Sequence, residues 1–329
     1  MLAVDNPTPL PAFVLPGLDH EGRTVVTVVV KATFLLREGD PALAEEQTPM
    51  RLTDEHTGEP GASSVRYESD LGPQKAGTDV ILVGQAWSPT PVPELEVSLA
   101  AGRLRKVVRV FGDRAFFRAG GEFGVSAPRP FTKMPLTWER AYGGADGATF
   151  EARNPVGVGF VESAEGAEDV RLPNLEDPRA LITHPHDRPA PAGFGVVARH
   201  WAPRRGYAGT MDEAWKEERF PLLPLDFDRR HHQSATADLI SPKPLSGGEP
   251  VRVEGASERG ALAFRVPSPR LQIGVSIKRS RAFHQPTLDT LLIEPDARRL
   301  TCTYRLTFPC PKSYLSVDGV TLDLLKGAA

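Results

Sequence analysis

Cysteine is scarce in this chain, whose 329 residues include only Cys302 and Cys310. Small secreted scaffolds held together by disulfides use cysteine far more heavily, so the sequence does not point to that class. Cys302 falls on the apolar phase of an alternating segment, which indicates a small core residue. Cys310 lies between two prolines and has no activating partner nearby in the sequence, and a catalytic thiol needs one. Both thiols are therefore expected to be inert.

Long hydrophobic runs are also missing. The longest apolar stretch, residues 25–36, is interrupted by Thr27, Lys31 and Thr33, which makes it too short and too polar to cross a bilayer. Residues 1–7 do not place a basic segment ahead of an apolar one, so they do not predict a secretory signal. We therefore expect a cytoplasmic protein without a membrane partner.

Neither sign of charge is in large excess. The formal net charge at pH 7 is −3 and the pI is about 6.3. Charge therefore does not draw the whole protein toward nucleic acid or anionic lipid. The densest basic run, residues 103–106, is followed by the valines of an expected strand, which favours a solvated strand end. We expect no nucleic-acid partner.

The sequence motifs that most often mark enzymes are lacking. Gly157-Val158-Gly159 begins like a dinucleotide-binding fingerprint, but Glu162 stands where the third glycine is required. There is neither a phosphate-binding loop ending in Gly-Lys-Ser/Thr nor the Gly-x-Ser-x-Gly turn of a serine hydrolase. We predict no catalytic residue, no cofactor-binding residue and no cofactor. These absences weaken an enzymatic function without excluding it.

Two histidine-containing loops, residues 184–187 and 226–232, place imidazoles near carboxylates. Zinc sites need three or four ligands that converge on one point. Adjacent histidines on an extended chain point apart, so His231 and His232 are poorly arranged for this. We predict surface-loop histidines and no metal site.

Pairs of neighbouring carboxylates, such as Asp226 with Asp228 or Glu176 with Asp177, also occur in the middle of the chain. Glycoside hydrolysis requires two carboxyl groups at a defined separation across a cleft, which spacing in sequence does not give. Caps, turns and loop hydrogen bonds explain most such acids. An enzyme acting on glycan or cell wall stays open as an alternative.

Glycine and proline are abundant, with 30 and 32 residues. Both interrupt regular structure, so we expect short strands and irregular ordered loops. Residues 24–36 form a β-branched run with little alternation, as in a strand covered on both faces. Residues 271–277 and 300–308 alternate apolar and polar side chains, which predicts strands. The expected fold is mainly β, with antiparallel sandwich or meander sheets, long Pro/Gly-rich loops and one or two short helices.

The first third of the chain predicts further strands at residues 78–87, 95–99 and 106–111. Residues 88–93 contain three prolines and predict a turn. Residues 39–77 are polar and show no clear pattern, which is typical of a long insertion.

The middle of the chain, roughly residues 120–235, is rich in proline, glycine and aromatic side chains and shows little periodicity. Its one convincing helix begins at Thr210–Glu213, where a capping box would pair the Thr210 side chain with the Glu213 amide. Pro221 would end this helix. Because no repeat or flexible linker is present, we predict one β-rich domain over residues 1–329, with this loop-rich segment between N-terminal and C-terminal strand regions.

Several motifs in the chain resemble one known family. Residues 131–144 read Phe-Thr-Lys-Met-Pro-Leu-Thr-Trp-Glu-Arg-Ala-Tyr-Gly-Gly, and residues 153–160 read Arg-Asn-Pro-Val-Gly-Val-Gly-Phe. Both are similar to the domain of unknown function 2169 family. Further similar segments lie at residues 29–34, 75–80, 110–114, 172–178, 188–195, 201–204, 209–215, 223–228, 245–249 and 288–295. The resemblance is collinear over nearly the whole chain, although residues 37–72 carry no recognised motif.

The resemblance implies a bacterial protein encoded beside components of a type VI secretion system. Proteins of that family are understood as chaperones or adaptors that bind a toxic effector and promote its loading onto the secretion spike. It therefore implies a non-enzymatic adaptor whose partner is a secreted effector, with a spike or PAAR-like tip protein as a further partner. A structural component of the spike tip is another alternative. The resemblance supplies no catalytic residue, and the oligomeric state stays open.

An adaptor needs a broad surface with aromatic and arginine anchors. The loop-rich middle supplies six candidate partner-binding side chains: Trp138, Arg140, Tyr142, Phe160, Phe194 and Trp201. The alternative, which is favoured for any single ring, is that these aromatics fill the core beneath long loops. Asn154 and Asn174 would likewise hydrogen-bond loop backbone.

Overall fold

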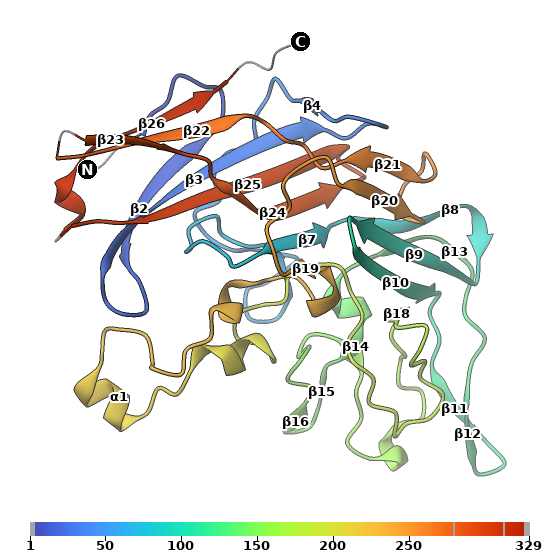
Figure 1. The fold of residues 1–329 in the computed structure, drawn as a ribbon. Coiled ribbons are helices and arrows are strands. Elements are labelled where there is room, and N and C mark those ends of the chain that lie inside the picture. The colour runs from blue at the N-terminus through green and yellow to red at the C-terminus, as the bar shows by residue number, and fades with distance from the viewer. Residues whose placement is uncertain (1–3, 279, 312, 326–329) are drawn as a thin grey trace.

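The protein folds mainly into β-strands in a computed structural model that describes residues 4–278, 280–311 and 313–325 (Figure 1). Three sheets of four or more strands contain most of the strand residues in this part of the chain, and two-stranded pairs lie in the connecting segments. Most neighbouring strands are antiparallel, and the helical elements are short. The expected fold class is therefore confirmed.

The largest sheet has seven strands. In order across the sheet they are β19 (Ile240–Ser241), β7 (Thr78–Leu82), β24 (Thr287–Glu294), β25 (Arg299–Pro309), β3 (Thr24–Leu35) and β2 (Ala12–Leu18), with β4 (Ala42–Leu43) also paired to β3. Residues 26–34 of β3 are all buried. The β-branched run in the sequence thus becomes a central strand covered on both faces, as predicted.

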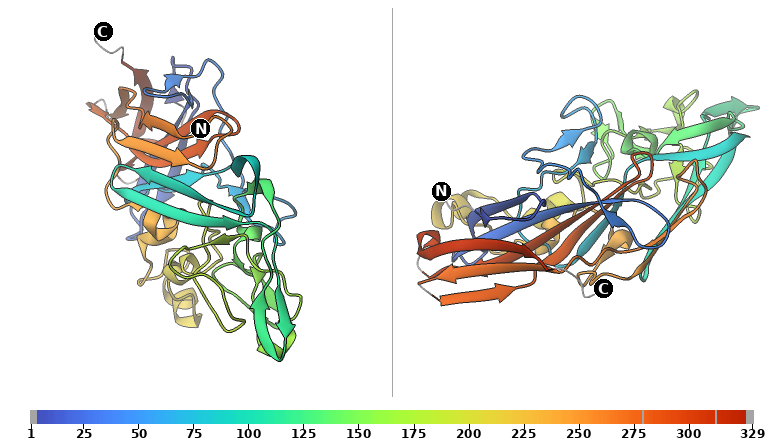
Figure 2. Two further views of the ribbon diagram at one scale, coloured as in Figure 1. Left: turned by 90° about the vertical axis from the view of Figure 1, so that its right-hand side faces the viewer. Right: turned by 90° about the horizontal axis from the view of Figure 1, so that it is seen from above.

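Two smaller sheets share a core with the large one. Figure 2 shows the four-stranded sheet as a layer beside the large sheet. Its order is β1 (Val4–Asp5), β26 (Val317–Leu324), β22 (Leu271–Ile277) and β23 (Ser280–His284). The five-stranded sheet has the order β18 (Leu175–Glu176), β10 (Leu104–Phe111), β9 (Glu94–Ala101), β20 (Pro250–Glu254) and β21 (Leu262–Arg265). Val28, Val97 and Ile273, one from each sheet, belong to one buried cluster.

The remaining elements are short. Paired strands are β5 (Glu55–His56) with β6 (Val65–Tyr67), β8 (Gln85–Val92) with β13 (Phe131–Pro135), β11 (Phe116–Ala119) with β12 (Glu122–Val125), β14 (Tyr142–Gly143) with β17 (Val158–Gly159), and β15 (Ala145–Asp146) with β16 (Thr149–Phe150). The helical elements are η1 (Trp138–Arg140), η2 (Ala164–Gly166), η3 (Arg204–Ala208), α1 (Glu213–Glu218), η4 (Arg229–His232), η5 (Ala237–Leu239) and η6 (Tyr314–Ser316). Over the described ranges, every helix is too short or too polar to pass through a bilayer.

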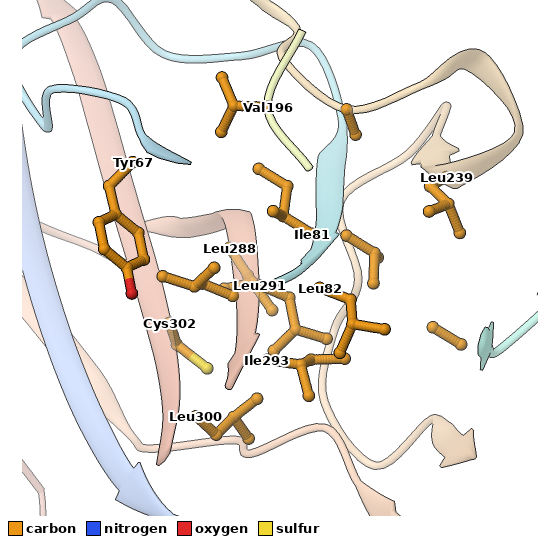
Figure 3. Packing of buried hydrophobic residues seen from close by; sticks show 14 of the residues in the cluster. Tyr67, Ile81, Leu82, Val196, Leu239, Leu288, Leu291, Ile293, Leu300 and Cys302 are labelled. Carbon is orange, nitrogen blue, oxygen red and sulfur yellow. The ribbon is translucent and has the colours of Figure 1, made fainter. Parts of the chain in front are cut away.

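Strand β25 shows how alternation builds the core. Leu300 and Cys302 are fully buried on one face and lie beside Leu291 and Ile293 of β24 (Figure 3). Side chains on a strand switch faces at every residue, so the apolar phase of the sequence forms one continuous layer. Cys302 is a core residue, as predicted.

The opposite face of β25 is buried as well, although it is polar. Thr301, Thr303 and Arg305 are each at most 5% exposed. Residues 44–75 cover this face: Lys31 on the neighbouring strand donates to the Pro49 carbonyl at 3.0 Å, and Arg305 donates to a carbonyl at residue 70 at 2.7 Å. The polar stretch that looked like an insertion is therefore an integral cover of the sheet.

The predicted Pro-rich turn at residues 88–93 is wrong. Strand β8 continues to Val92 and pairs only with β13 in a two-stranded ribbon. Proline cannot donate to a ladder, but a strand in such a ribbon uses one edge, so Pro89 and Pro91 are tolerated. The predicted strand at residues 78–87 is instead broken at residues 83–84, between β7 and β8.

The helix in the middle begins later than predicted. Asp212, rather than Thr210, caps α1 by accepting a hydrogen bond from the Trp215 amide at 2.9 Å. Thr210 is engaged elsewhere, because its amide and hydroxyl both donate to Asp226. The predicted capping box does not form, because the Thr210 side chain is hydrogen-bonded to a residue distant in the sequence.

Candidate functional site

Four of the six candidate partner-binding side chains lie inside the protein. Trp138, Tyr142, Phe194 and Trp201 are each at most 4% exposed. The two tryptophan rings meet edge to face, with centroids 6.1 Å apart, and Trp138 Nε1 donates to the Val196 carbonyl at 2.8 Å. These side chains fill the core beneath the loops, which is the alternative that the sequence left open.

The other two candidates are half-buried. Arg140 donates to Asp113 at 3.3 Å and to Asn174 at 3.1 Å. Phe160 packs against a smaller apolar cluster, with the guanidinium of Arg188 at 5.4 Å from its ring centre. The six side chains do not form a common exposed surface. Partner contact through Arg140 and Phe160 stays a prediction.

Asn154 organises the most recognisable motifs. Its buried side-chain amide donates to the carbonyls of Trp138 at 2.8 Å and Tyr142 at 3.0 Å. Gly143 and Gly157 approach so closely that a Cβ would lie 2.1 Å and 2.4 Å from atoms of Asn154. This packing explains why both positions carry glycine. The motifs therefore hold the loops together, and residues 157–159 run into strand β17 rather than a phosphate-binding loop.

The other groups considered for chemistry are engaged within the chain. In the described ranges, no three His, Cys, Asp or Glu side chains are grouped so that they could hold a metal ion. Burial raises the pKa of Cys302 to about 12, which keeps its thiol protonated. The four carboxylates are bonded as follows: Asp226 to Thr210, Asp228 to Arg230, Glu176 to Arg114 and Asp177 to Arg179.

A layer of buried ion pairs lies on the polar face of the large sheet. Lys31 Nζ lies 2.6 Å from Asp70 Oδ2, and Lys75 Nζ lies 2.6 Å from Asp79 Oδ2. All four side chains are at most 8% exposed. Buried charges persist only when they are paired and hydrogen-bonded, so residues 70–75 are fixed in place on the sheet.

A groove opens beside this layer, and we call it the α1 groove. It has a volume of about 240 Å³. Its apolar wall consists of Ala208, Met211, Leu223 and Phe227. Its charged wall consists of Glu68, Lys75, Arg199, Arg204 and Arg305, and His231 and His232 also line it. An apolar wall facing a few placed polar groups is the common form of a binding pocket.

Glu68 anchors the charged wall. Its carboxylate lies 2.9 Å from Arg204, 3.1 Å from Arg199 and 3.7 Å from Lys75. Burial alone would raise the pKa of this carboxyl, but the three cations outweigh it and hold the pKa well below its ordinary value. Glu68 is therefore charged at neutral pH and fixes the arginines, and it is poorly suited to accept a proton in catalysis.

Residues 209–228, which we call the α1 excursion, include Met211 of the groove lining and two further large apolar side chains that are exposed outside it. Met211, Phe220 and Leu225 are 52%, 66% and 86% exposed. The excursion is braced at its base, where Thr210 donates to Asp226. Large exposed apolar side chains gathered on one ordered segment make it a candidate interaction site.

The chain was also compared with known proteins. A family model described as "Uncharacterized protein conserved in bacteria (DUF2169)" matches residues 21–305. The chain belongs to the DUF2169 family. A search of curated proteins and a search of solved structures each gave no match. The DUF2169 match includes both the buried ion pairs and the α1 groove.

Sequence reasoning did not find the α1 groove, because its walls come from segments that are far apart in the chain. Residues 68–75, 199–211, 223–232 and Arg305 meet only in the fold. Two signals were present in the sequence. Arginines cluster at residues 199–205, and residues 220–227 hold several large apolar side chains between prolines.

Proposed function

We propose that this DUF2169 protein is a non-enzymatic adaptor of the bacterial cytoplasm that binds a type VI secretion effector and helps to load it onto the spike. The resemblance of its sequence motifs to that family supports the secretion role. The observation that carries the binding role is the α1 groove, together with the exposed apolar side chains of the α1 excursion. An adaptor requires such a surface on a stable scaffold.

The α1 excursion has the chemistry of a protein-binding surface. Phe220 and Leu225 stand in water, although transfer of apolar surface out of water is favourable by about 25 cal/mol per Å². The braced base of the excursion limits the entropy that a partner's arrival would cost. A partner side chain would enter the groove while Phe220 and Leu225 contact the partner beside it.

Co-purification tests this function directly. Tagged protein is co-expressed with the products of neighbouring genes, and we expect one effector to be retained through mild salt. The double variant Phe220→Ser/Leu225→Ser should lower the retained amount by about tenfold, because anchor residues dominate binding energy. Both residues are exposed, so the thermal midpoint of unfolding should not change.

A matched control uses exposed apolar residues elsewhere on the protein. Phe283 and Leu315, which are 53% and 78% exposed, lie outside the α1 excursion. Phe283→Ser/Leu315→Ser should retain the effector as the unmodified protein does. The proposal would be overturned if the protein retained no product of a neighbouring gene. It would also be overturned if the two double variants retained equal amounts of effector. An adaptor should also stay in the producing cell, whereas a spike-tip component would appear in the secreted fraction.

A further inference from the structure

Two cations of the charged wall have carboxylates behind them. Lys75 is paired with Asp79 at 2.6 Å, and Arg305 is paired with Asp289 at 2.5 Å. Both acids are fully buried and do not line the α1 groove. These two pairs are therefore close to neutral and contribute little net charge to the groove.

The other two cations share a single acid. Arg199 and Arg204 both contact Glu68, which is the one acidic side chain in the lining. Arg204 is buried and also donates to the Val197 carbonyl, whereas Arg199 is 48% exposed at the mouth. One positive charge on this wall is thus left without a counter-charge.

Two further arginines lie outside the lining, on the short helices that carry some of the lining residues. Arg205 lies in η3 beside Arg204, and Arg229 begins η4, which ends at the lining residues His231 and His232. Both arginines are exposed, and neither forms an ion pair within the described residues. Exposed guanidinium groups without an intramolecular carboxylate partner are suited to partner carboxylates.

The acidic side chains of α1 and its cap, like Arg205 and Arg229, lie outside the lining and do not change the charge balance within it. Asp212, Glu213, Glu217 and Glu218 belong to α1 or its cap, and none of them lines the groove. Glu213 is paired with Lys216. Burial and, after it, nearby cationic groups lower the pKa of His232 to about 4, consistent with a positive potential at the groove.

We infer that the α1 groove takes an acidic segment of the partner polypeptide. An apolar side chain of that segment rests on the wall formed by Met211 and Phe227, and flanking carboxylates meet Arg205 and Arg229. The whole protein carries a net charge of −3, so this local positive charge selects a site rather than attracting acidic proteins in general. The inference rests on the proposed function in taking the partner to be a protein.

Synthetic peptides test the inference without knowledge of the effector. The probe is a fluorescein-labelled peptide, Gly-Glu-Glu-Leu-Asp-Phe-Glu-Gly, followed by anisotropy at low salt. One comparison peptide has lysine at every acidic position, and another has serine in place of Leu and Phe. We expect the acidic apolar peptide to bind at least about tenfold more tightly than either, because both charge and apolar contact are required.

Charge reversal in the protein gives the second arm. Arg205→Glu/Arg229→Glu should weaken binding of the acidic peptide by about tenfold or more. The matched control Arg103→Glu/Arg105→Glu reverses two exposed arginines of the β9–β10 hairpin and should leave binding unchanged. The inference would be overturned if the acidic peptide did not bind or if the lysine peptide bound equally well. It would also be overturned if Arg205→Glu/Arg229→Glu bound the acidic peptide as tightly as the unmodified protein does.

The two proposals fail in different ways. Suppose that retention of an effector requires Phe220 and Leu225 but is unchanged by charge reversal at Arg205 and Arg229. This result would support the adaptor function and contradict the inference of an acidic partner segment. Peptide binding that depends on both arginines, with no neighbouring product retained, would do the reverse.

Discussion

His232 lines the α1 groove, where burial first, and then the neighbouring charges of His231 and Arg229, lower its pKa to about 4. The ordinary value for a histidine is 6.5, so the unfolded chain takes up this proton at a higher pH than the folded chain does. The contribution of His232 to stability is therefore complete above pH 6.5 and is lost as the pH falls toward 4.

Replacement of this histidine should make the stability of the protein fall less steeply as the pH is lowered. The urea midpoint of the unmodified protein is expected to drop between pH 6.5 and pH 4 more steeply than that of His232→Gln. His200→Gln, at an exposed histidine, serves as the control and should keep the original slope. Identical slopes for His232→Gln and the unmodified protein would contradict this account.

Single residues were the hardest features to place from sequence. Trp138 and Trp201 suit a binding surface by residue type, but the core uses the same large rings, and only the fold decides between the two. Arg305 is charged, yet it lies in the interior, where it pairs with Asp289 and donates to the cover segment. Such choices depend on partners far away in the sequence, which periodicity does not reveal.

Among the elements, the α1 excursion is held by a few hydrogen bonds, and the bonds between Thr210 and Asp226 form a clasp at its base. Asp226 accepts from the Thr210 amide at 2.9 Å and from its hydroxyl at 2.8 Å. Arg219 also ties the excursion to the β2–β3 turn by donating to the His20 carbonyl at 2.7 Å. These few polar bonds, rather than a deep core, position Phe220 and Leu225, which are both exposed.

Loss of the clasp should loosen the excursion without unfolding the protein. In Asp226→Ala, trypsin should cleave after Lys216 faster than in the unmodified protein, because local opening of a lightly packed segment becomes easier. The thermal midpoint of the whole protein should change little, since both clasp residues are exposed. Asp238→Ala, at an exposed aspartate outside the excursion, is the control. Equal cleavage rates in the three proteins would refute the role of the clasp.

Strands with a clear β-branched or alternating sequence pattern were predictable, and elements whose ends depend on tertiary contacts were not. Residues 24–36 and 300–308 gave β3 and β25 nearly residue by residue, because a β-branched or alternating run suits a sheet. The capping box at Thr210 failed because Asp226 occupies that side chain. The turn at residues 88–93 failed because a two-stranded ribbon tolerates proline.

At the scale of the whole molecule, burial is uneven. Residues 26–34 of β3 are buried between β2 and β25, whereas all five residues of the edge strand β23 are exposed. Hydrogen exchange followed by mass spectrometry should show amides of β3 exchanging at least about a hundredfold more slowly than those of β23. Equal protection of the two strands would contradict this picture and would indicate that β23 pairs with another chain in solution.

The sequence predicted the fold class but not the assembly of its parts. Sequence patterns predict which residues form strands, but they do not predict which strands pair. In the large sheet, β3 pairs with β25, which is distant in the chain. The cover formed by residues 44–75 lacks an apolar period because it faces Lys31 and Arg305. The α1 groove depends on that cover, so it could not be predicted before the cover was known.

The bond between Thr210 and Asp226 has an evolutionary consequence. It joins the two ends of the α1 excursion, so insertions and substitutions between them need not disturb the sheets. Doubling the length of a loop costs only about 0.6 kcal/mol of closure entropy. Under the adaptor proposal, a lineage could change its cargo by altering residues 211–225 alone. Homologues that serve different cargo are expected to diverge most within this stretch while keeping the clasp.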